Sequence, residues 1–214
     1  MPLYFQENIN LHTRLGIWKI TEPESYFLKN VVPIKVIHHP EKRIQHLAAN
    51  FLLTQLFPNF PQASIQMSAS NKPYIYSSHY FFSLAHTSGF AAALISTQSN
   101  SGVDLERISP KPNQLSNKFL NPNEITLIKS NQINQQPDTA FTLAWCAKEA
   151  VYKCWGKGAI SLKNNIEITH SSLHQISCNL AVENQQFSLN VHTMILEKLC
   201  LAWVLDDTNI FKHT

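Results

Sequence analysis

Two carboxylates stand two residues apart in the segment Gly102-Val103-Asp104-Leu105-Glu106. Side chains two apart on a strand point to one face, so a strand here presents Asp104 and Glu106 together. Paired carboxylates repel each other unless a positive charge lies between them. A hard divalent cation such as Mg²⁺ supplies that charge and keeps positions open for phosphate oxygens. The alternative is a solvated strand end with two ordinary acids.

A second charged group lies in the segment Trp145–Lys153, which has the pattern of a helix. Glu149 and Lys153 are four residues apart and share one helix face. If Glu149 meets the two acids of the first segment, three carboxylates surround one metal. Lys148 and Lys153 then place positive charge beside it, an arrangement that suits a pyrophosphate. A helical ion pair without chemistry is the alternative.

Two long helices and several strands must position these residues. Apolar residues at three- and four-residue steps predict helices over Pro40–Phe57 and Thr139–Trp155, the second with Asp138 as N-cap and Gly156 at its end. Short apolar runs between turn signals predict strands. These runs are Leu15–Ile20, Tyr80–Leu84, Phe90–Ile95, Val103–Glu106, Ile166–Thr169, Ile176–Val182, Phe187–His192 and Leu199–Leu205.

Each half of the chain therefore offers a long helix and several strands. This pattern predicts an α+β protein of two similar-sized lobes, residues 1–108 and 109–214. The run Ser109–Asn113, with the sequence SPKPN, is the predicted hinge between them.

Composition excludes several classes of protein. Of the 214 residues, 44% are hydrophobic and 14% are charged, with a net charge of +3 and no dense Lys/Arg block, which argues against nucleic-acid binding. The four cysteines form no C-x-x-C pair, so a zinc site of ordinary spacing is not expected. We find no signal-peptide pattern, no run of membrane-spanning length and no Gly-rich nucleotide loop. We expect a cytoplasmic protein with reduced thiols.

The two motifs together resemble the signature pair of the 4′-phosphopantetheinyl transferases. The matching residues are Gly102-Val103-Asp104-Leu105-Glu106 and Trp145-x-x-Lys148-Glu149-Ala150-x-x-Lys153, in this order and at this separation. The length is similar to that of the surfactin-type (group II) members, which are two-lobed pseudo-dimers in one chain. The holo-acyl-carrier-protein synthase type is much shorter and works as a trimer. The resemblance thus implies a monomer with the pseudo-dimeric α+β fold of this family.

Further segments extend the resemblance and imply roles for single residues. Lys72-Pro73 resembles the G-K-P segment with Asn71 in place of Gly, and Phe82–Thr87 resembles F-N-x-S-H-S with Ala85 in place of Ser. Phe119–Glu124 resembles F-F-S-x-x-E. The implied metal ligands are Asp104, Glu106 and Glu149, the implied catalytic residues are Glu124 (as base), Lys153 and Lys148, and the implied coenzyme A contacts are Arg43, Lys72, His86, Lys148 and Lys153.

The resemblance also implies the reaction. Such an enzyme moves the 4′-phosphopantetheine group from coenzyme A to a serine of an apo acyl or peptidyl carrier protein and releases 3′,5′-ADP, with Mg²⁺ or Mn²⁺. Three alternatives stay open at this point. They are an inactive module of the same fold that binds coenzyme A or a carrier protein, another Mg²⁺-dependent phosphate enzyme, and a structural domain whose acids and lysines are surface pairs.

Overall fold

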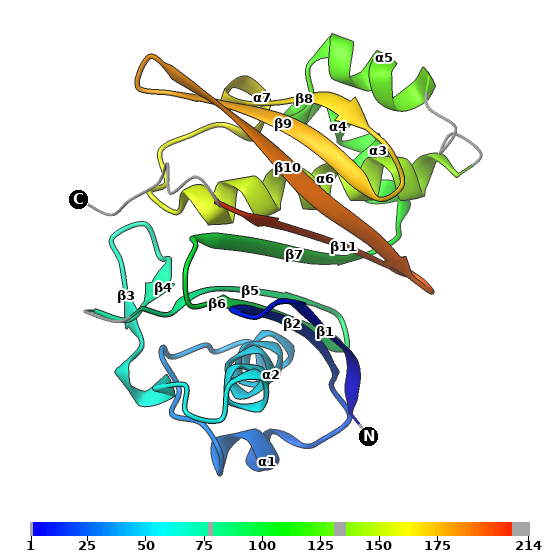
Figure 1. Ribbon diagram of the computed structural model, residues 1–214. Coiled ribbons are helices and arrows are strands. Elements are labelled where there is room, and N and C mark those ends of the chain that lie inside the picture. The colour runs from blue at the N-terminus through cyan, green and yellow to red at the C-terminus, as the bar shows by residue number, and fades with distance from the viewer. Residues whose placement is uncertain (1, 77–78, 131–135, 207–214) are drawn as a thin grey trace.

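The computed structural model describes residues 2–76, 79–130 and 136–206, which form two lobes, each built on an antiparallel sheet (Figure 1). The first sheet has the order β1-β2-β6-β5. Its strands are β1 (Leu3–Asn10), β2 (Thr13–Lys19), β5 (Phe81–Thr87) and β6 (Phe90–Ser96). One face of this sheet is covered by helix α2 (Pro40–Leu56), with α1 (Glu24–Leu28) beside it.

The second sheet has the order β7-β11-β10-β9-β8. Its strands are β7 (Ser101–Arg107), β8 (Ile166–Ser171), β9 (Gln175–Val182), β10 (Gln185–Leu196) and β11 (Leu199–Leu205). The long helix α6 (Pro137–Trp155) packs on one face of it. Shorter helices lie around α6, namely α3 (Pro110–Gln114), α4 (Ser116–Phe119), α5 (Pro122–Ser130) and α7 (Leu162–Asn165).

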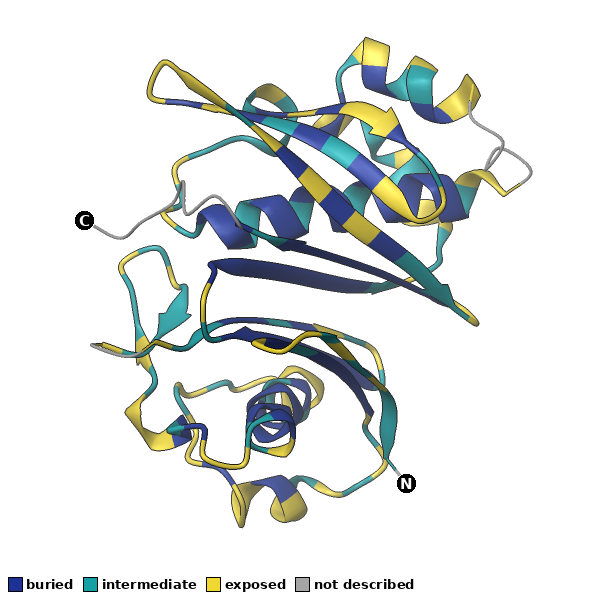
Figure 2. Cartoon of the chain, in the orientation of Figure 1, coloured by how far each residue is buried: buried dark blue, intermediate teal, exposed yellow. Residues whose placement is uncertain are grey.

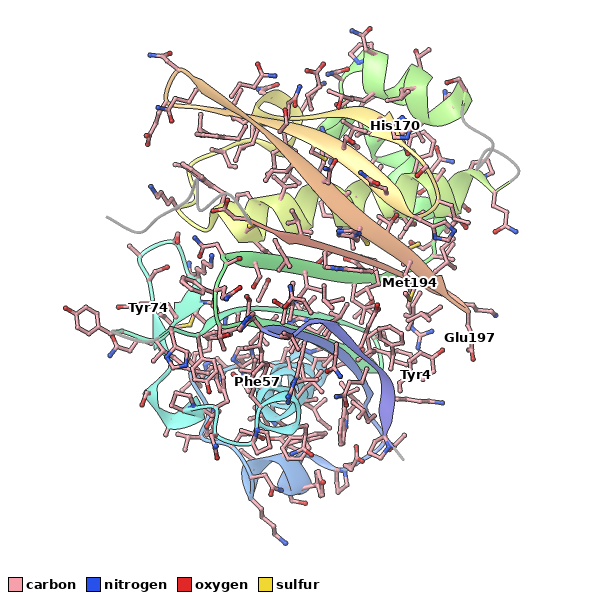
Figure 3. The ribbon with its side chains drawn as sticks, in the orientation of Figure 1. Tyr4, Phe57, Tyr74, His170, Met194 and Glu197 are labelled. Atoms are coloured by element: carbon pink, nitrogen blue, oxygen red, sulfur yellow. The ribbon has the colours of Figure 1, made fainter. Side chains whose placement is uncertain are left out.

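The two lobes meet through the sheet faces that their helices leave free. Apolar side chains of β2, β5 and β6 pack there against those of β7 and β11, and β6 and β11 are buried along almost their whole length (Figure 2). At one side of this junction the hydroxyl of Tyr4 on β1 bonds to Glu197 in the turn after β10 (Figure 3). The junction is therefore a continuous apolar core, which fixes one lobe against the other.

A small hairpin projects from the first lobe toward the second. It consists of β3 (Gln66–Met67) and β4 (Pro73–Tyr74), and a 3-10 turn over Gln62–Ser64 precedes it. The turn of this hairpin reaches the C-terminal end of α6. It becomes one wall of the cavity described below.

The predicted fold class is confirmed, as are the predicted strands and both long helices, to within a few residues at their ends. Helix α6 begins earlier than predicted. Gln136 is its N-cap and Pro137 its first residue, because proline already has the φ of a first helical position, and Asp138 lies in the first turn.

The predicted division at 108/109 needs a correction. Strand β7 pairs with β11 along its whole length, so residues 101–107 belong to the second sheet, and the chain passes between the lobes before Ser101. The predicted hinge over Ser109–Asn113 is in fact the start of α3. Strand β1, helix α1 and the β3–β4 hairpin were not predicted. No helix in the described ranges is long and apolar enough to cross a membrane.

Candidate active site at the lobe junction

Strand β7 and helix α6 lie against each other because both present small residues at their contact. Ala144, Ala147 and Ala150 of α6 are fully buried. A Cβ atom at Gly102 would overlap the carbonyl oxygen of Ala150, so only glycine permits this approach. The close packing brings the acids of β7 to the face of α6 that carries Glu149.

Asp104 and Lys153 form an ion pair across this contact. The Lys153 ammonium lies 2.7 Å from Asp104 Oδ1 and also donates to the carbonyl of Val103 at 3.1 Å. Asp104 is 6% exposed, while 28% of the Lys153 side chain is exposed. Asp104 Oδ2 is buried and has no hydrogen-bond partner among the described residues. One carboxylate oxygen at the junction is thus buried without a hydrogen-bond donor from the described residues.

The three predicted metal ligands are electrostatically coupled. Burial and then the charge of Asp104 raise the pKa of Glu106 to about 7, against smaller opposing effects of Lys153, Trp145 and Thr87. Burial and Asp104 also raise the pKa of Glu149. The structure therefore gathers an excess of negative charge that Lys153 alone does not neutralise.

Lys153 keeps its proton in this setting. Burial lowers the pKa of its amine, but Asp104 and then Glu149 raise it more, so that the pKa lies above its ordinary value. The amine is a fixed positive charge at the junction.

A cavity of about 250 Å³ opens beside these groups, between the lobes. Glu149, Tyr152 and Lys153 of α6 line it from one side, and Lys72 and Phe82 of the first lobe from the other. A charged ligand in this cavity would therefore touch both lobes.

Basic groups of the first lobe approach the same junction. Desolvation and then Lys153 lower the pKa of His86, which keeps an exposed edge. Burial, then Lys35 and His86, lower the pKa of His46 to about 4, and its Nε2 atom has no partner among the described residues. Lys35 and His46 also line a second cavity of about 420 Å³. Sequence reasoning missed both residues, because neither lies in a recognisable motif.

Glu124 and Lys148 lie together but are sealed from solvent. Their charged atoms are 2.6 Å apart, with side-chain exposures of 1% and 0%. The amine also donates to the carbonyls of Phe119 and Leu162, and the carboxylate accepts from the backbone N–H groups of Asn121 and Ile168. Since every oxygen of Glu124 has a protein donor, the geometry does not favour its predicted role as base. Nor does it favour contact between Lys148 and coenzyme A.

The Arg43 side chain is also held by hydrogen bonds to other groups of the protein. Its guanidinium pairs with both carboxylate oxygens of Glu24, at 2.7 and 3.0 Å. A further N–H group donates to the carbonyls of Ile37 and His38. Arg43 thus shapes the loop that carries Lys35, and its predicted direct contact with coenzyme A stays a prediction.

The residues present partly fit a metal ion. The donor set of Asp104, Glu106 and Glu149 is all oxygen, as a hard divalent cation prefers, and the buried Asp104 Oδ2 lacks a partner. Within the described ranges, however, no three His, Cys, Asp or Glu side chains converge closely enough to hold a metal as they stand. Lys153 occupies Asp104 Oδ1 instead.

Comparison with known proteins points to one family. Residues 100–204, just under half of the chain, match the family model described as the 4′-phosphopantetheinyl transferase superfamily. The chain is also 34% identical over 80 residues to a Synechocystis sp. protein named "Putative 4'-phosphopantetheinyl transferase slr0495". That alignment covers 36% of this chain and 32% of the relative, so the match spans about a third of the relative's length. The matched family segment contains β7 and α6, the two elements that carry the carboxylates and Lys153.

Proposed function

We propose that this chain is a two-lobed 4′-phosphopantetheinyl transferase of the surfactin-type subfamily. It would transfer 4′-phosphopantetheine from coenzyme A to a serine of an apo acyl or peptidyl carrier protein and release 3′,5′-ADP. Acting as a monomer in the cytoplasm is part of the same proposal.

One observation carries this proposal. Asp104 and Lys153 form an ion pair beside an interlobe cavity that Lys153 and Glu149 line, and the charge of Asp104 acts on both Glu106 and Glu149. All four residues lie within the segment that matches the transferase superfamily. Carboxylates and an ammonium near a cavity are groups that phosphoryl transfer uses, since its catalysis rests on positioning and charge neutralisation.

Asp104, Glu106 and Glu149 would hold Mg²⁺, with Mn²⁺ as a substitute. Such a cation neutralises pyrophosphate oxygens and acts as a Lewis acid. Lys153 releases Asp104 Oδ1 for this purpose and turns toward the phosphates, where its charge stabilises the leaving group.

The reaction also moves one proton. The serine oxygen forms a bond to the β-phosphorus, while the bond from that phosphorus to the bridging oxygen of the α-phosphate breaks. The serine proton passes to solvent in the cavity, because Glu149, the carboxylate that lines the cavity, would be a ligand of the cation. Glu124 would not accept it, because its oxygens are occupied.

Lys35, His46 and His86 would anchor the nucleotide end of coenzyme A. They are three basic groups that influence one another's charge, and His46 Nε2 is a buried nitrogen without a partner in the described part of the chain. Phosphate oxygens satisfy such a group and relieve the repulsion among its members.

Intact-mass spectrometry tests the proposal. An apo carrier protein is incubated with this protein, coenzyme A and Mg²⁺, with and without a chelator. We expect the carrier to gain one phosphopantetheine, and the gain to disappear with chelator. If several carrier proteins gain nothing while calorimetry shows that coenzyme A binds, the chain is the inactive binding module instead.

A further inference from the structure

The turn of the β3–β4 hairpin is tied to the C-terminal end of α6 by two side chains. Lys72 Nζ donates to the carbonyl of Cys154 at 3.3 Å, and Ser70 Oγ donates to the carbonyl of Gly156 at 2.6 Å. These contacts join residues more than eighty positions apart in the sequence. They link the lobes on the cavity side, whereas the apolar core links them elsewhere.

We propose that Lys72 is a positioning residue that holds the last turn of α6, and with it Lys153, in place. This contrasts with the direct coenzyme A contact that the sequence predicts for it. The two hydrogen bonds from Lys72 and Ser70 to the end of α6 form a clamp that does not depend on the proposed function. The effect of this clamp on catalysis rests on the proposed function.

The surroundings of the Lys72 amine explain why it binds a helix end. Lys72 is half-buried, burial lowers the pKa of its amine, and it forms no ion pair with any described residue. The last carbonyls of a helix have no partners within the helix and carry the negative end of its dipole. The end of α6 thus supplies the negative potential that a carboxylate would otherwise provide.

Gly156 shows that the two elements are fitted to each other. It ends α6 in the left-handed region, with φ at 68°. A Cβ atom at this position would overlap the side-chain carbons and the amine of Lys72. The lysine side chain therefore crosses the space that the absent Cβ leaves, and the sequence needs glycine here for packing as well as for φ.

The hairpin turn is rigid enough to act as an anchor. Ser68 Oγ lies 2.8 Å from Ser70 Oγ and accepts from the backbone N–H of Lys72 at 3.0 Å. The backbone N–H of Ser68 in turn donates to the carbonyl of Lys72. These bonds fix Ser70 and Lys72 relative to each other before either reaches α6.

The clamp matters because Lys153 directly precedes Cys154. Without Lys72, the final turn of α6 would fray, since its carbonyls would lose a buried partner. The backbone of Lys153 would then move, and with it the position from which the amine reaches Asp104 or a phosphate. Small displacements of a positioned group cost large factors in rate, so the loss should appear in kcat.

Substitutions at positions 72, 156 and 89 test this. Lys72→Met keeps the stem and removes the charge, and Gly156→Ala displaces the same amine from the other side. Gly89→Ala is the matched control, because Gly89 also has a positive φ, of 75°, while its Cβ would meet only the end of the Arg107 side chain, at 3.4 Å. The readouts are hydrogen exchange of residues 153–156, the Kd for coenzyme A by calorimetry, and kcat with an apo carrier protein.

We expect Lys72→Met and Gly156→Ala to speed exchange in the last turn of α6 and to lower kcat by roughly tenfold or more, with the Kd for coenzyme A within about threefold. In a Lys72→Ala background, Gly156→Ala should cost no more stability than Gly89→Ala, because the side chain it displaces is gone. If Lys72→Met instead raises the Kd by roughly tenfold and leaves exchange unchanged, Lys72 is a phosphate ligand and the clamp is refuted. If the parent protein transfers nothing, the proposed function fails. Hydrogen exchange, and the stability cost of Gly156→Ala with and without Lys72, still test whether the clamp exists.

Discussion

Helix α6 carries two lysines five residues apart, Lys148 and Lys153, and each pairs with a carboxylate of another element. Lys148 and Glu124 are sealed, with side-chain exposures of 0% and 1%, and neighbouring backbone groups complete their hydrogen bonds. Lys153 and Asp104 meet at a similar distance, but the lysine is 28% exposed and one aspartate oxygen lacks a described partner. The same chemical groups therefore hold the lobe together in one place, whereas in the other the lysine lines a cavity and one aspartate oxygen is left unsatisfied.

Breaking the sealed pair should have the largest effect. Glu124→Gln leaves the Lys148 ammonium buried without its counter-charge, so the free energy of unfolding should fall by about 3–5 kcal/mol. Urea denaturation measures this. Glu124→Gln combined with Lys148→Met removes both charges and should recover part of the loss. A cost below about 1 kcal/mol for the single variant would mean that the pair is not a structural unit.

Neutralising the open pair should affect activity instead. Asp104→Asn keeps the shape of the side chain and removes its charge, so the proposed transfer of phosphopantetheine should fall by about 10²–10³-fold. The denaturation midpoint should stay near that of the parent, because solvent reaches Lys153. Steady-state kinetics and urea denaturation on the same preparation separate the two effects. A loss of stability as large as that of Glu124→Gln would remove the distinction between the pairs.

Replacing each lysine with arginine compares how much space surrounds the two side chains. Lys148→Arg forces a larger head group into a sealed site and should destabilise the protein by about 1–3 kcal/mol. Lys153→Arg has the cavity beside it and should leave the denaturation midpoint unchanged within error, with activity reduced. Equal destabilisation by both substitutions would show that the open site is packed as tightly as the sealed one.

His46 is a half-buried base, and its effect should be the smallest. Its pKa is about 4 in the folded protein against an ordinary value of 6.5. Between these values the unfolded chain binds a proton that the folded protein does not, so stability should fall as pH drops from about 6.5 to about 4. Partial exposure limits the change to about 1–2 kcal/mol.

Urea denaturation across this pH range checks the effect of His46. His46→Gln should flatten the profile relative to the parent. His170→Gln, at an exposed position on β8, serves as the control and should not (Figure 3). If stability still falls as steeply with decreasing pH in His46→Gln, a group other than His46 causes the loss.

The sequence predicted those parts of the fold that depend on local patterns. The apolar periodicity of α2 and α6 and the short apolar strands each carry their own signal. Strand β1 was missed because its segment, LYFQENIN, is largely polar after its first three residues. The sheet to which β7 belongs could not be predicted, since its partner β11 lies almost a hundred residues later.

The candidate site was predicted by residue type but not by environment. Motif spacing indicated Asp104, Glu149 and Lys153, and these lie at the junction. The same motifs also indicated Glu124 and Lys148, because a sequence shows that a residue is charged and not whether it is sealed. Burial depends on α4, α5, α7 and β8 packing around the pair, and no local pattern encodes that.

The pairing of β7 with β11 also determines when the site can form during synthesis of the chain. The first sheet has all its strands by Ser96, but β7 must wait for residues 199–205 to leave the ribosome before its edge is covered. Contacts between such distant segments form late and slowly, and an uncovered strand edge is prone to intermolecular pairing. The acids of β7 can therefore reach their final place only when nearly all of the described chain has been made, so a nascent chain released before β11 would carry the charged motif without a working site.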